Sequence, residues 1–236
     1  MQKVALITGT GSGIGKALAE LLLSENYLVF GYSRTNQIEN KNFTFTKIDL
    51  SNLEEVRKLK FPNINVATNV LLVNNAATIG SILPLDKKAT TDIINEYHLN
   101  LITPTLLSRK FISTCPTHQK LLINIGSGAA NSPIASWSTY CVTKSGLDML
   151  TEVINEENHD NLQLFSIHPG VVDTKMQYEI RNSERRYFPL LDKFIAYYND
   201  KELENIQDTA KKIYYILQNA NKFSDNIISL RNVKIK

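Results

Sequence analysis

Two side chains near the middle of the chain have the types and the spacing needed to move a proton together. Tyr140 and Lys144 are four residues apart, which places both on one face of a helix. A free phenol has a pKa of about 10, and a nearby ammonium group favours its ionised form. A tyrosine and a lysine held in this way can transfer a proton to or from a carbonyl oxygen near neutral pH. Because this spacing is common on helix surfaces, it indicates catalysis only together with other residues.

A glycine cluster near the N-terminus predicts a turn that binds phosphate. Residues 4–8 form a short apolar run rich in branched side chains, as expected for a strand buried on both faces. Gly9, Gly13 and Gly15 follow directly, and residues 16–23 then have helical character. Glycine permits a tight turn and lets backbone N–H groups approach a phosphate at a helix N-terminus. The glycine spacing is wider than in the common dinucleotide-binding motif, but a nucleotide site is favoured over a simple flexible turn.

The rest of the chain predicts alternating strands and helices. We expect strands at 3–8, 27–33, 44–48, 70–73, 120–125, 162–167 and 225–230. We expect helices at 13–24, 52–58, 87–97 continuing through 99–115, 139–157 and 207–219. This alternation predicts an α/β fold with a doubly wound parallel sheet and helices on both faces. Because no repeat or flexible linker interrupts it, residues 1–236 are expected to form a single domain.

Composition excludes several other classes of protein. The chain has 236 residues, 43% of them hydrophobic, which is enough for one α/β domain. The net charge of +3 is small and dispersed, so no nucleic-acid partner is expected, and the pairs Lys87–Lys88 and Arg185–Arg186 are interpreted as solvated surface. Cys115 and Cys141 match neither a metal-ligand pattern nor a disulfide framework. The early first strand leaves no room for a signal peptide, and no apolar run is long enough to span a membrane. A soluble, cytoplasmic protein without a metal is expected.

Taken together, these segments resemble the short-chain dehydrogenase/reductase family over nearly the whole chain. Residues 8–15 resemble its cofactor motif, and residues 74–77 resemble its NNAG segment, with Ala77 in place of the usual glycine. The family's catalytic tetrad is matched in order and spacing by Asn100, Ser127, Tyr140 and Lys144. Pro169–Gly170, with Thr174 shortly after, resembles the segment that closes over the nicotinamide. The resemblance implies a Rossmann-type, mainly seven-stranded parallel sheet, in which residues 174–204 form a helical lid over the substrate.

The resemblance also implies a role for each member of the tetrad. Tyr140 would be the general acid in reduction, and Ser127 would hydrogen-bond the same substrate oxygen. Lys144 would lower the pKa of Tyr140 and hold the nicotinamide ribose, while Asn100 would keep a water molecule in a proton relay. Alone, Ser127 could be a turn residue and Asn100 a helix cap. His98, His168 and Cys141 are expected to be structural.

The end of the second strand favours NADP(H) over NAD(H). Ser33 lies at about the position where NAD-binding folds place an acidic residue, and Arg34 comes next. A hydroxyl and a guanidinium would bind a 2′-phosphate that a carboxylate would repel, although Arg34 could be an ordinary solvated residue. Asp49 resembles the family's adenine-contacting aspartate. The expected cofactor-binding residues are Gly9, Ser12, Gly13, Ile14, Gly15, Ser33, Arg34, Asp49, Leu50, Asn75, Ala76, Tyr140, Lys144, Pro169, Gly170, Val172 and Thr174.

The expected substrate pocket is apolar and partly aromatic. Its residues are Gly128, Ala129, Trp137, Val171 and Met176, although Trp137 could equally belong to the core or an interface. Such a pocket fits an apolar or aromatic ketone or an α-dicarbonyl. Residues 124–130, 137–144 and 169–181 resemble the sepiapterin reductase and benzil reductase branch, which reduces vicinal dicarbonyls with NADPH. Gly126 replaces the serine commonly found before the catalytic one, a change expected to reshape the oxyanion region slightly.

Two other functions and an oligomeric state complete the expectations. The chain could be an NADP-dependent alcohol or steroid dehydrogenase working in the oxidative direction. It could also be a regulator that senses NADP(H) without turnover, but such binders often lose the tyrosine or the lysine, and this chain retains both. In the family, the helices that carry Asn100 and Tyr140 often pack against a partner subunit. Apolar residues at helical spacing in 101–114 and 139–154 agree with a homodimer or homotetramer.

Overall fold

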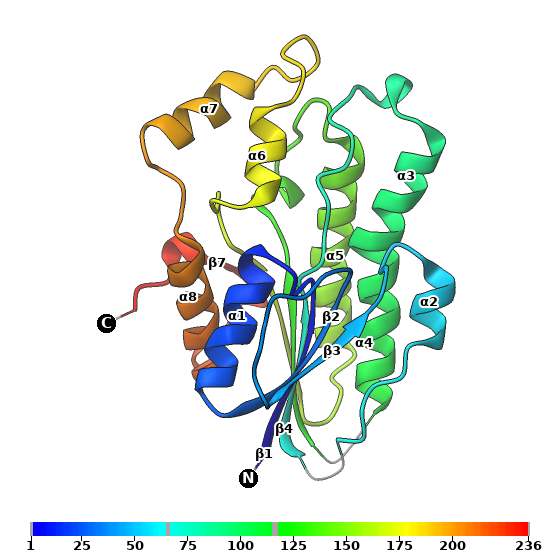
Figure 1. Ribbon diagram of the computed structural model, residues 1–236, viewed down its shortest axis with the longest axis vertical. Helices are drawn as coiled ribbons and strands as arrows, with labels where there is room; N and C mark the ends of the chain where they lie inside the picture. Colours follow the sequence, from blue (N-terminus) through cyan, green and yellow to red (C-terminus); the bar gives the residue numbers. More distant parts are fainter. Residues whose placement is uncertain (1, 65–66, 115–117, 236) are drawn as a thin grey trace.

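A single parallel sheet organises the part of the chain that the structure describes. The computed structural model describes residues 2–64, 67–114 and 118–235 (Figure 1). Within these ranges, seven parallel strands lie in the order β3-β2-β1-β4-β5-β6-β7. The strands are β1 (Gln2–Thr8), β2 (Tyr27–Ser33), β3 (Phe43–Lys47), β4 (Ala67–Asn74), β5 (Gln119–Ile125), β6 (Leu162–His168) and β7 (Ile227–Ser229). The doubly wound α/β fold predicted from the sequence is therefore confirmed.

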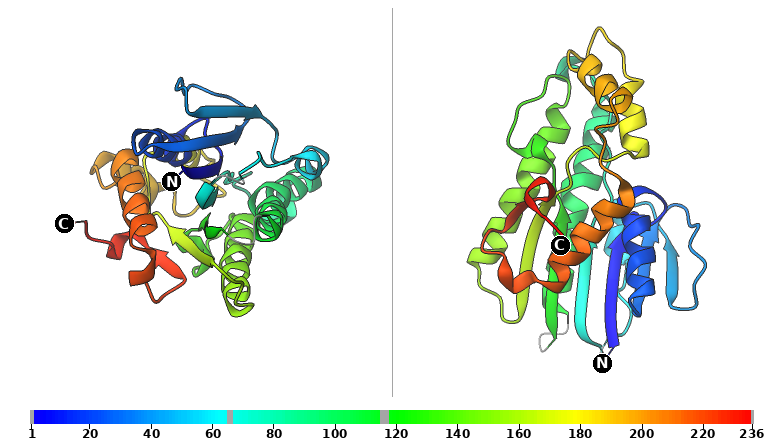
Figure 2. Two further views of the ribbon diagram at one scale, coloured as in Figure 1. Left: turned by 90° about the horizontal axis from the view of Figure 1, so that it is seen from below. Right: turned by 90° about the vertical axis from the view of Figure 1, so that its left-hand side faces the viewer.

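Helices cover both faces of this sheet. They are α1 (Gly13–Ser24), α2 (Leu53–Lys58), α3 (Thr90–Tyr97), α4 (Thr103–Ser113), α5 (Ser138–Glu156), α6 (Lys175–Arg181), α7 (Leu191–Asn199) and α8 (Ile206–Gln218). Figures 1 and 2 show α1 and α8 on one face and α2, α4 and α5 on the other. No helix in the described ranges is long and apolar enough to cross a membrane.

The alternation of side chains along β1 explains why the sheet is apolar on both faces. Ala5 and Ile7 pack in the cluster shared with α1 and α8, whereas Val4 and Leu6 pack in the cluster shared with α2, α4 and α5. Successive side chains of a strand point to opposite faces, so a strand covered on both sides must be apolar throughout. This is the reason that residues 4–8 read as a continuous apolar run.

The structure corrects the expected helix at 87–97. Residues Leu85–Lys87 form a single 3-10 turn, the backbone of Lys88 and Ala89 is extended, and α3 begins only at Thr90. A π-helical turn, His98–Ile102, then joins α3 to α4. The expected continuation to residue 115 is also too long, because α4 ends at Ser113 and Thr114 has an extended backbone. Cys115 lies outside the described residues. The last strand is shorter than expected, with three residues.

A third apolar cluster lies beyond the carboxyl ends of the strands. It joins residues at the start of α5 to residues of α6, α7 and the loop between them, and it includes Trp137, Tyr140, Phe188 and Phe194. Figure 1 shows α6 and α7 above the ends of the strands, at the position expected for a lid. In open α/β sheets, ligands bind at this edge of the sheet. The fold therefore places the site between the strand ends and the segment that contains α6 and α7.

Candidate active site

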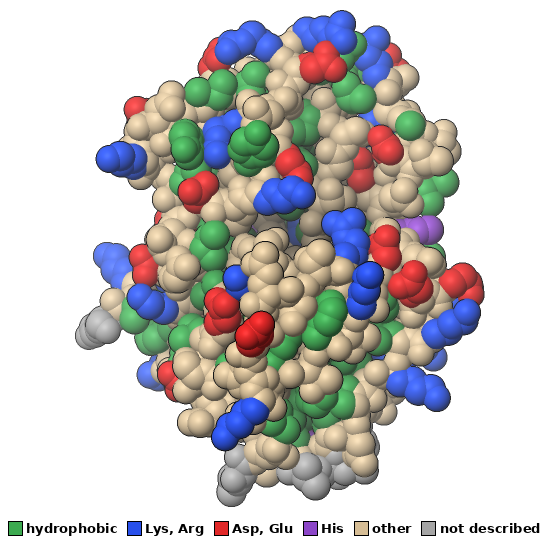
Figure 3. Space-filling view, in the orientation of Figure 1, with side chains coloured by type: hydrophobic (Ala, Val, Ile, Leu, Met, Phe, Trp, Pro, Cys, Tyr) green, Lys and Arg blue, Asp and Glu red, His purple; other side chains and the backbone are tan. Residues whose placement is uncertain are grey.

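The residues expected to bind a nucleotide converge on the carboxyl edge of the sheet. They lie at strand ends, in the turns directly after, or in the first turn of α1: Gly9 and Ser12 after β1, Gly13, Ile14 and Gly15 at the start of α1, Ser33 and Arg34 at β2, Asp49 and Leu50 after β3, Asn75 and Ala76 after β4, and Pro169, Gly170, Val172 and Thr174 after β6. In the space-filling view, the surface is indented between this edge and the lid, and Lys and Arg side chains border the indentation (Figure 3). The topology thus gathers these separate motifs along one edge.

The turn between β1 and α1 has the shape of a phosphate cradle. Gly9 has a φ of +75°, and a Cβ atom there would lie 2.7 Å from the Asn75 Nδ2 atom. Asn75 fastens this turn to β4, because its Nδ2 donates to the Thr8 carbonyl at 2.9 Å. Helix α1 has no acidic residue in its first turn. A helix N-terminus that is free of negative charge and flanked by glycine attracts phosphate, so these residues fit a nucleotide.

The segment after β6 reaches the same turn from the other side. A Cβ atom on Gly13 would lie 3.5 Å from the Thr174 Cγ2 atom, so Thr174 packs directly against the glycine turn. Gly170 has a φ of +83°, which sharply redirects the chain after β6. Val172 is buried and forms an isolated bridge with Glu204. The chain from Gly170 to Thr174 is therefore held above the place where a nucleotide would lie.

At the end of β2, the two residues expected to bind a 2′-phosphate differ in their exposure to solvent. Ser33 is buried, and its hydroxyl donates to the Thr35 carbonyl at 2.7 Å. Arg34 is exposed. Hydrogen bonds from Ser51 hold the pKa of the Asp49 carboxyl below its usual value, and the Arg34 guanidinium lowers it further. Arg34 thus lies near Asp49 at an open edge of the site, with its side chain available to a ligand.

Tyr140 and Lys144 meet as their helical spacing predicts. Both are buried in α5, and the Lys144 Nζ lies 5.8 Å from the centroid of the Tyr140 ring. The Lys144 ammonium also donates to the Ile125 carbonyl at the end of β5, at 2.7 Å. Burial lowers the pKa of Lys144 to about 8, and Asp148 opposes part of this effect. A buried lysine with its pKa close to neutrality is suited to proton transfer.

The pKa of Tyr140 moves in the direction opposite to that expected. Burial raises it, and the hydrogen bond with Ser127 compensates only in part. Desolvation of the phenolate is the largest cause, so the lowering expected from Lys144 does not set the net direction of the shift. The neutral phenol is therefore favoured. Its hydroxyl lies 3.9 Å from the Met176 Sδ atom of α6, to which it donates a weak hydrogen bond.

Asn100 is turned inward by the π-helical turn between α3 and α4. Its Oδ1 accepts from the Thr78 N–H at 2.9 Å, and its Nδ2 donates to the Thr78 carbonyl at 2.8 Å. The same Nδ2 donates to the Thr143 hydroxyl at 3.4 Å. A π-helical turn inserts one residue into a helix and is frequent at functional sites. Asn100 thereby links the chain after β4 to the helix that carries Tyr140 and Lys144.

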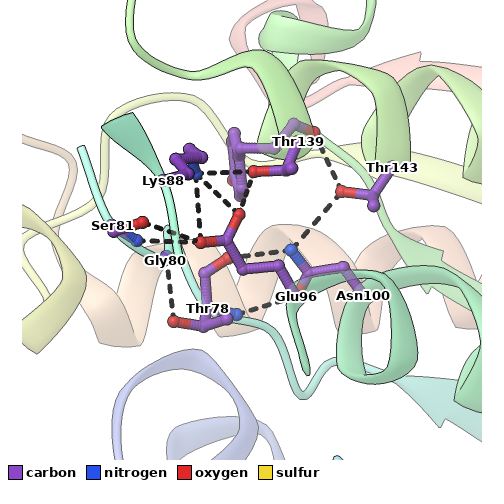
Figure 4. Close-up of polar contacts among 9 residues, drawn as sticks. Thr78, Gly80, Ser81, Lys88, Glu96, Asn100, Thr139 and Thr143 are labelled. Carbon is purple, nitrogen blue, oxygen red and sulfur yellow. Dashed lines mark hydrogen bonds and ion pairs between the residues drawn. The ribbon is translucent and has the colours of Figure 1, made fainter. Parts of the chain in front are cut away.

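A buried ion pair supports this corner of the site (Figure 4). The Lys88 Nζ lies 2.8 Å and 3.0 Å from the two Glu96 carboxylate oxygens, and it also donates to the Thr139 hydroxyl at 2.7 Å. The Thr139 hydroxyl donates to Glu96, and the Ser81 N–H donates to the same carboxylate at 2.9 Å. The two charged side chains are 0% and 3% exposed. The interpretation of Lys88 as solvated surface is therefore wrong.

Sequence reasoning missed this network because nothing local indicates it. Thr139 directly precedes Tyr140, Glu96 is one helical turn before Asn100, and Lys88 comes from the preceding loop. In the sequence, Lys88 lies 8 residues from Glu96 and 51 residues from Thr139. A weak signal was present in Gly80, because a Cβ atom there would occupy the space that the Glu96 carboxylate fills.

The expected substrate residues divide into a buried and an open group. Trp137 is buried between aromatic rings, 5.5 Å from the centroid of Tyr140 and 5.4 Å from that of Phe188. Ala129 is also buried. Gly128 faces open space, since a Cβ atom there would meet nothing within 4 Å. Val171 and Met176 are half-buried. Trp137 is thus part of the apolar cluster that contains Phe188 and Phe194, as well as a neighbour of Tyr140.

Comparison with known proteins agrees with this geometry. The family model for short chain dehydrogenase matches residues 3–185. This chain belongs to the short-chain dehydrogenase family. It is therefore an oxidoreductase of a family that binds nicotinamide cofactors. Within the described residues, no group of three or more His, Cys, Asp or Glu side chains could hold a metal ion.

Relatives of this short-chain dehydrogenase include two kinds of carbonyl reductase. A benzil reductase ((S)-benzoin forming) from Bacillus cereus is 32% identical over 237 residues, covering 92% of this chain and 94% of the relative. A sepiapterin reductase from Xenopus tropicalis is 28% identical over 253 residues, covering 95% of each chain. The predicted relationship to this branch of the family is confirmed.

Solved structures show the same fold with different cofactors. The structure of 4-hydroxyisoleucine dehydrogenase complexed with NADH has a TM-score of 0.80 at 22% identity, covering 97% of this chain and 96% of that one. The closed form of serine dehydrogenase complexed with NADP⁺ has a TM-score of 0.76 at 17% identity, covering 99% and 97%. The fold alone therefore does not choose between the two cofactors.

Proposed function

We propose that this protein is an NADPH-dependent carbonyl reductase acting on an apolar or aromatic ketone, and in particular on an α-dicarbonyl such as benzil. The observation that carries the proposal is the position of the Tyr140 hydroxyl, which lies beside Ser127 and Lys144 at the base of an aromatic cluster. The relationship to benzil reductase and sepiapterin reductase supports this substrate class.

In the proposed reaction, four side chains have distinct roles. The nicotinamide cofactor supplies a hydride to the carbonyl carbon. Tyr140 is the general acid that protonates the carbonyl oxygen, and Ser127 donates a hydrogen bond to the same oxygen, so both donors meet the charge that develops there. Lys144 holds a positive charge near the phenol and would contact the nicotinamide ribose. Asn100 holds the proton path in position through Thr78 and Thr143.

The raised pKa of Tyr140 suits the direction of reduction. A general acid must hold its proton until the transition state, and burial keeps the phenol neutral. The weak hydrogen bond to the Met176 Sδ leaves the hydroxyl easily recruited by a stronger acceptor. A substrate carbonyl oxygen would replace this sulfur as the partner of the phenol. Met176, Val171 and Gly128 are therefore proposed to line the substrate site.

A buried donor next to Tyr140 is proposed to meet a second oxygen of the substrate. The Trp137 Nε1 has no hydrogen-bond partner among the described residues, although its side chain is buried. Buried polar groups in proteins are rarely left without a partner. The second carbonyl of a dicarbonyl would satisfy it while the first carbonyl meets Tyr140. Trp137 would then orient the substrate as well as pack against the lid.

The cofactor preference is proposed from Ser33 and Arg34. The remaining cofactor contacts are proposed for the glycine turn, Asp49–Leu50, Asn75–Ala76 and the segment from Pro169 to Thr174, which meet at one edge of the sheet. We propose that the chain works as one oxidoreductase domain with residues 174–204 as its lid. A reducing cytoplasm is the proposed compartment, in agreement with the free thiol of Cys141.

The direct test is the oxidation of NADPH in the presence of benzil, with NADH measured in parallel. Turnover with benzil that depends on NADPH would support both the substrate class and the 2′-phosphate contact of Arg34. Preference for NADH would overturn the cofactor assignment. Absence of turnover with benzil, sepiapterin and other aromatic dicarbonyls would overturn the proposed substrate class.

A homodimer or homotetramer is proposed as the working state. Members of this family are commonly oligomeric. On α5, the exposed side chains Val142, Met149 and Val153 form an apolar stripe that the described chain leaves uncovered. Sedimentation at micromolar concentration should give a species larger than the 26.7 kDa chain. Met149→Glu should reduce its size, and a monomeric wild-type protein would contradict the proposal.

A further inference from the structure

A buried carboxylate lies one helical turn from Lys144 on α5, and the proposed reaction does not use it. Asp148 is one helical turn after Lys144 on α5, so the two side chains share a face of the helix. It is 5% exposed. Carboxylates are rarely buried without a partner that is charged or donates hydrogen bonds.

Two residues of β6 hold this carboxylate in place. The Ser166 hydroxyl donates to the Asp148 Oδ1 at 2.5 Å, and the His168 Nε2 lies 2.8 Å from Oδ2. Both partners are buried as well. His168 directly precedes Pro169 and Gly170, where the chain turns over the proposed nicotinamide site. Asp148 is therefore fixed between the helix that carries Lys144 and the strand that leads to the cofactor segment.

Gly126 provides the space for this arrangement. A Cβ atom on Gly126 would lie 2.5 Å from the Ser166 Oγ, 2.7 Å from the His168 Cδ2 and 3.0 Å from the Asp148 Oδ1. Any side chain at this position would force at least one of these three side chains to move. The sequence suggested that glycine here reshapes the oxyanion region. The structure gives another reason, which is room for a buried carboxylate behind the reaction centre.

The effect of the carboxylate on Lys144 is electrostatic. Among the described residues, the ammonium donates one hydrogen bond, to the Ile125 carbonyl. Burial lowers the pKa of Lys144 to about 8, and the nearby Asp148 raises it. Among the described residues, Tyr140 and Cys141 lie one helical turn before Lys144 on α5, and His168 of β6 contacts Asp148. A buried ammonium that loses its opposing charge releases its proton more easily.

We propose that Asp148, held by Ser166 and His168, is a positioning residue that keeps the Lys144 ammonium charged and directed toward Tyr140. Its carboxylate supplies the opposing charge that a buried lysine needs, and Gly126 keeps that charge within reach. The inference depends on the proposed function in one respect, which is that Lys144 takes part in the reaction. The contacts around Asp148 do not depend on the substrate.

The first test follows the protonation of Lys144 itself and needs no turnover. NMR titration of protein with carbon-labelled lysine would follow the Lys144 signal, assigned by its loss in Lys144→Arg. In Asp148→Asn, the midpoint of this titration should move to lower pH by about one unit, since a nearby opposite charge has an effect of that order. Glu152→Gln, one turn further along α5, is the matched control and should leave the midpoint unchanged. An unchanged midpoint in Asp148→Asn overturns the proposal.

The second test uses the pH profile of reduction. The alkaline fall in kcat/KM should move to lower pH in Asp148→Asn, because the ammonium is lost earlier as pH rises. His168→Gln retains a nitrogen donor but removes a titratable ring, so its alkaline limb should stay near that of the wild type. A merely structural role of Asp148 would lower kcat/KM equally at all pH values, which would contradict the proposal.

The two tests separate this inference from the proposed function. If the wild type reduces no dicarbonyl, the proposed function fails, and the NMR titration still decides the role of Asp148. If Asp148→Asn does not fold, Gly126→Ala replaces it, because the added methyl group displaces the same carboxylate. The Lys144 midpoint in Gly126→Ala should then move in the same direction, and its failure to move overturns the proposal.

Discussion

The two ends of the proposed cofactor site hold their charged side chains in different ways. At the catalytic end, Lys144 and Lys88 are buried, and each has fixed partners within the protein. At the β2 end, Arg34 is exposed, with Asp49 as its charged neighbour. Charges that must act on a developing transition state are thus positioned before any ligand binds. A charge that only recognises a phosphate can remain in solvent until the phosphate arrives.

The largest effect is expected when the proton donor at the catalytic end is removed. Tyr140→Phe should lower turnover by about 10²- to 10⁴-fold, the range for a positioned general acid. Binding of NADPH, followed by its fluorescence, should be nearly unchanged. Tyr215→Phe on α8 is the matched control and should keep full activity. Equal turnover in Tyr140→Phe and the wild type would contradict the proposed mechanism.

The second effect concerns the buried ion pair next to Tyr140. Glu96→Ala leaves the Lys88 ammonium buried and unpaired, so it should lower the free energy of unfolding by about 3–5 kcal/mol. Urea denaturation measures this change. The double variant Lys88→Met with Glu96→Leu should recover part of the loss, because it removes both charges. If Glu96→Ala lowers the free energy of unfolding by less than about 1 kcal/mol, the ion pair does not stabilise the region next to Tyr140.

The third effect tests the exposed end of the site. Arg34→Ala should lower kcat/KM with NADPH by roughly 10- to 100-fold, the value of a hydrogen bond to a charged group. The value with NADH should change little, because NADH lacks the 2′-phosphate. Arg57→Ala, which removes an exposed arginine from α2, serves as the control. Equal losses with both cofactors would show that Arg34 does not select between them.

The smallest effect is expected where an ion pair is wholly exposed. Arg185 and Asp192 form such a pair in the lid region, with side chains 67% and 72% exposed. Asp192→Ala should lower the free energy of unfolding by less than about 1 kcal/mol, because solvent screens the pair. The same urea titration used for Glu96→Ala measures it. A loss as large as that of Glu96→Ala would remove the distinction between buried and exposed charges.

The sequence alone predicted the local elements and the motifs carried on them. The apolar run at 4–8, the glycines after it and the helical spacing of Tyr140 and Lys144 are short-range patterns. Each reflects a constraint that a few neighbouring residues impose, such as burial on two faces or a turn that requires glycine. For this reason the strands, most helices and the meeting of Tyr140 with Lys144 were predicted within a few residues.

The tertiary structure decided which distant side chains stabilise that site. Lys88 looked like a surface residue because a pair of lysines carries no local sign of its partner. Its burial depends on Glu96 and Thr139, which reach it only after the loop, α3 and α5 pack together. Likewise, Asp148 and His168 meet across α5 and β6, and the raised pKa of Tyr140 follows from its burial in the cluster that it forms with Phe188 and Phe194. Burial and long-range charge are properties of the folded chain, and they determine how the motif residues ionise.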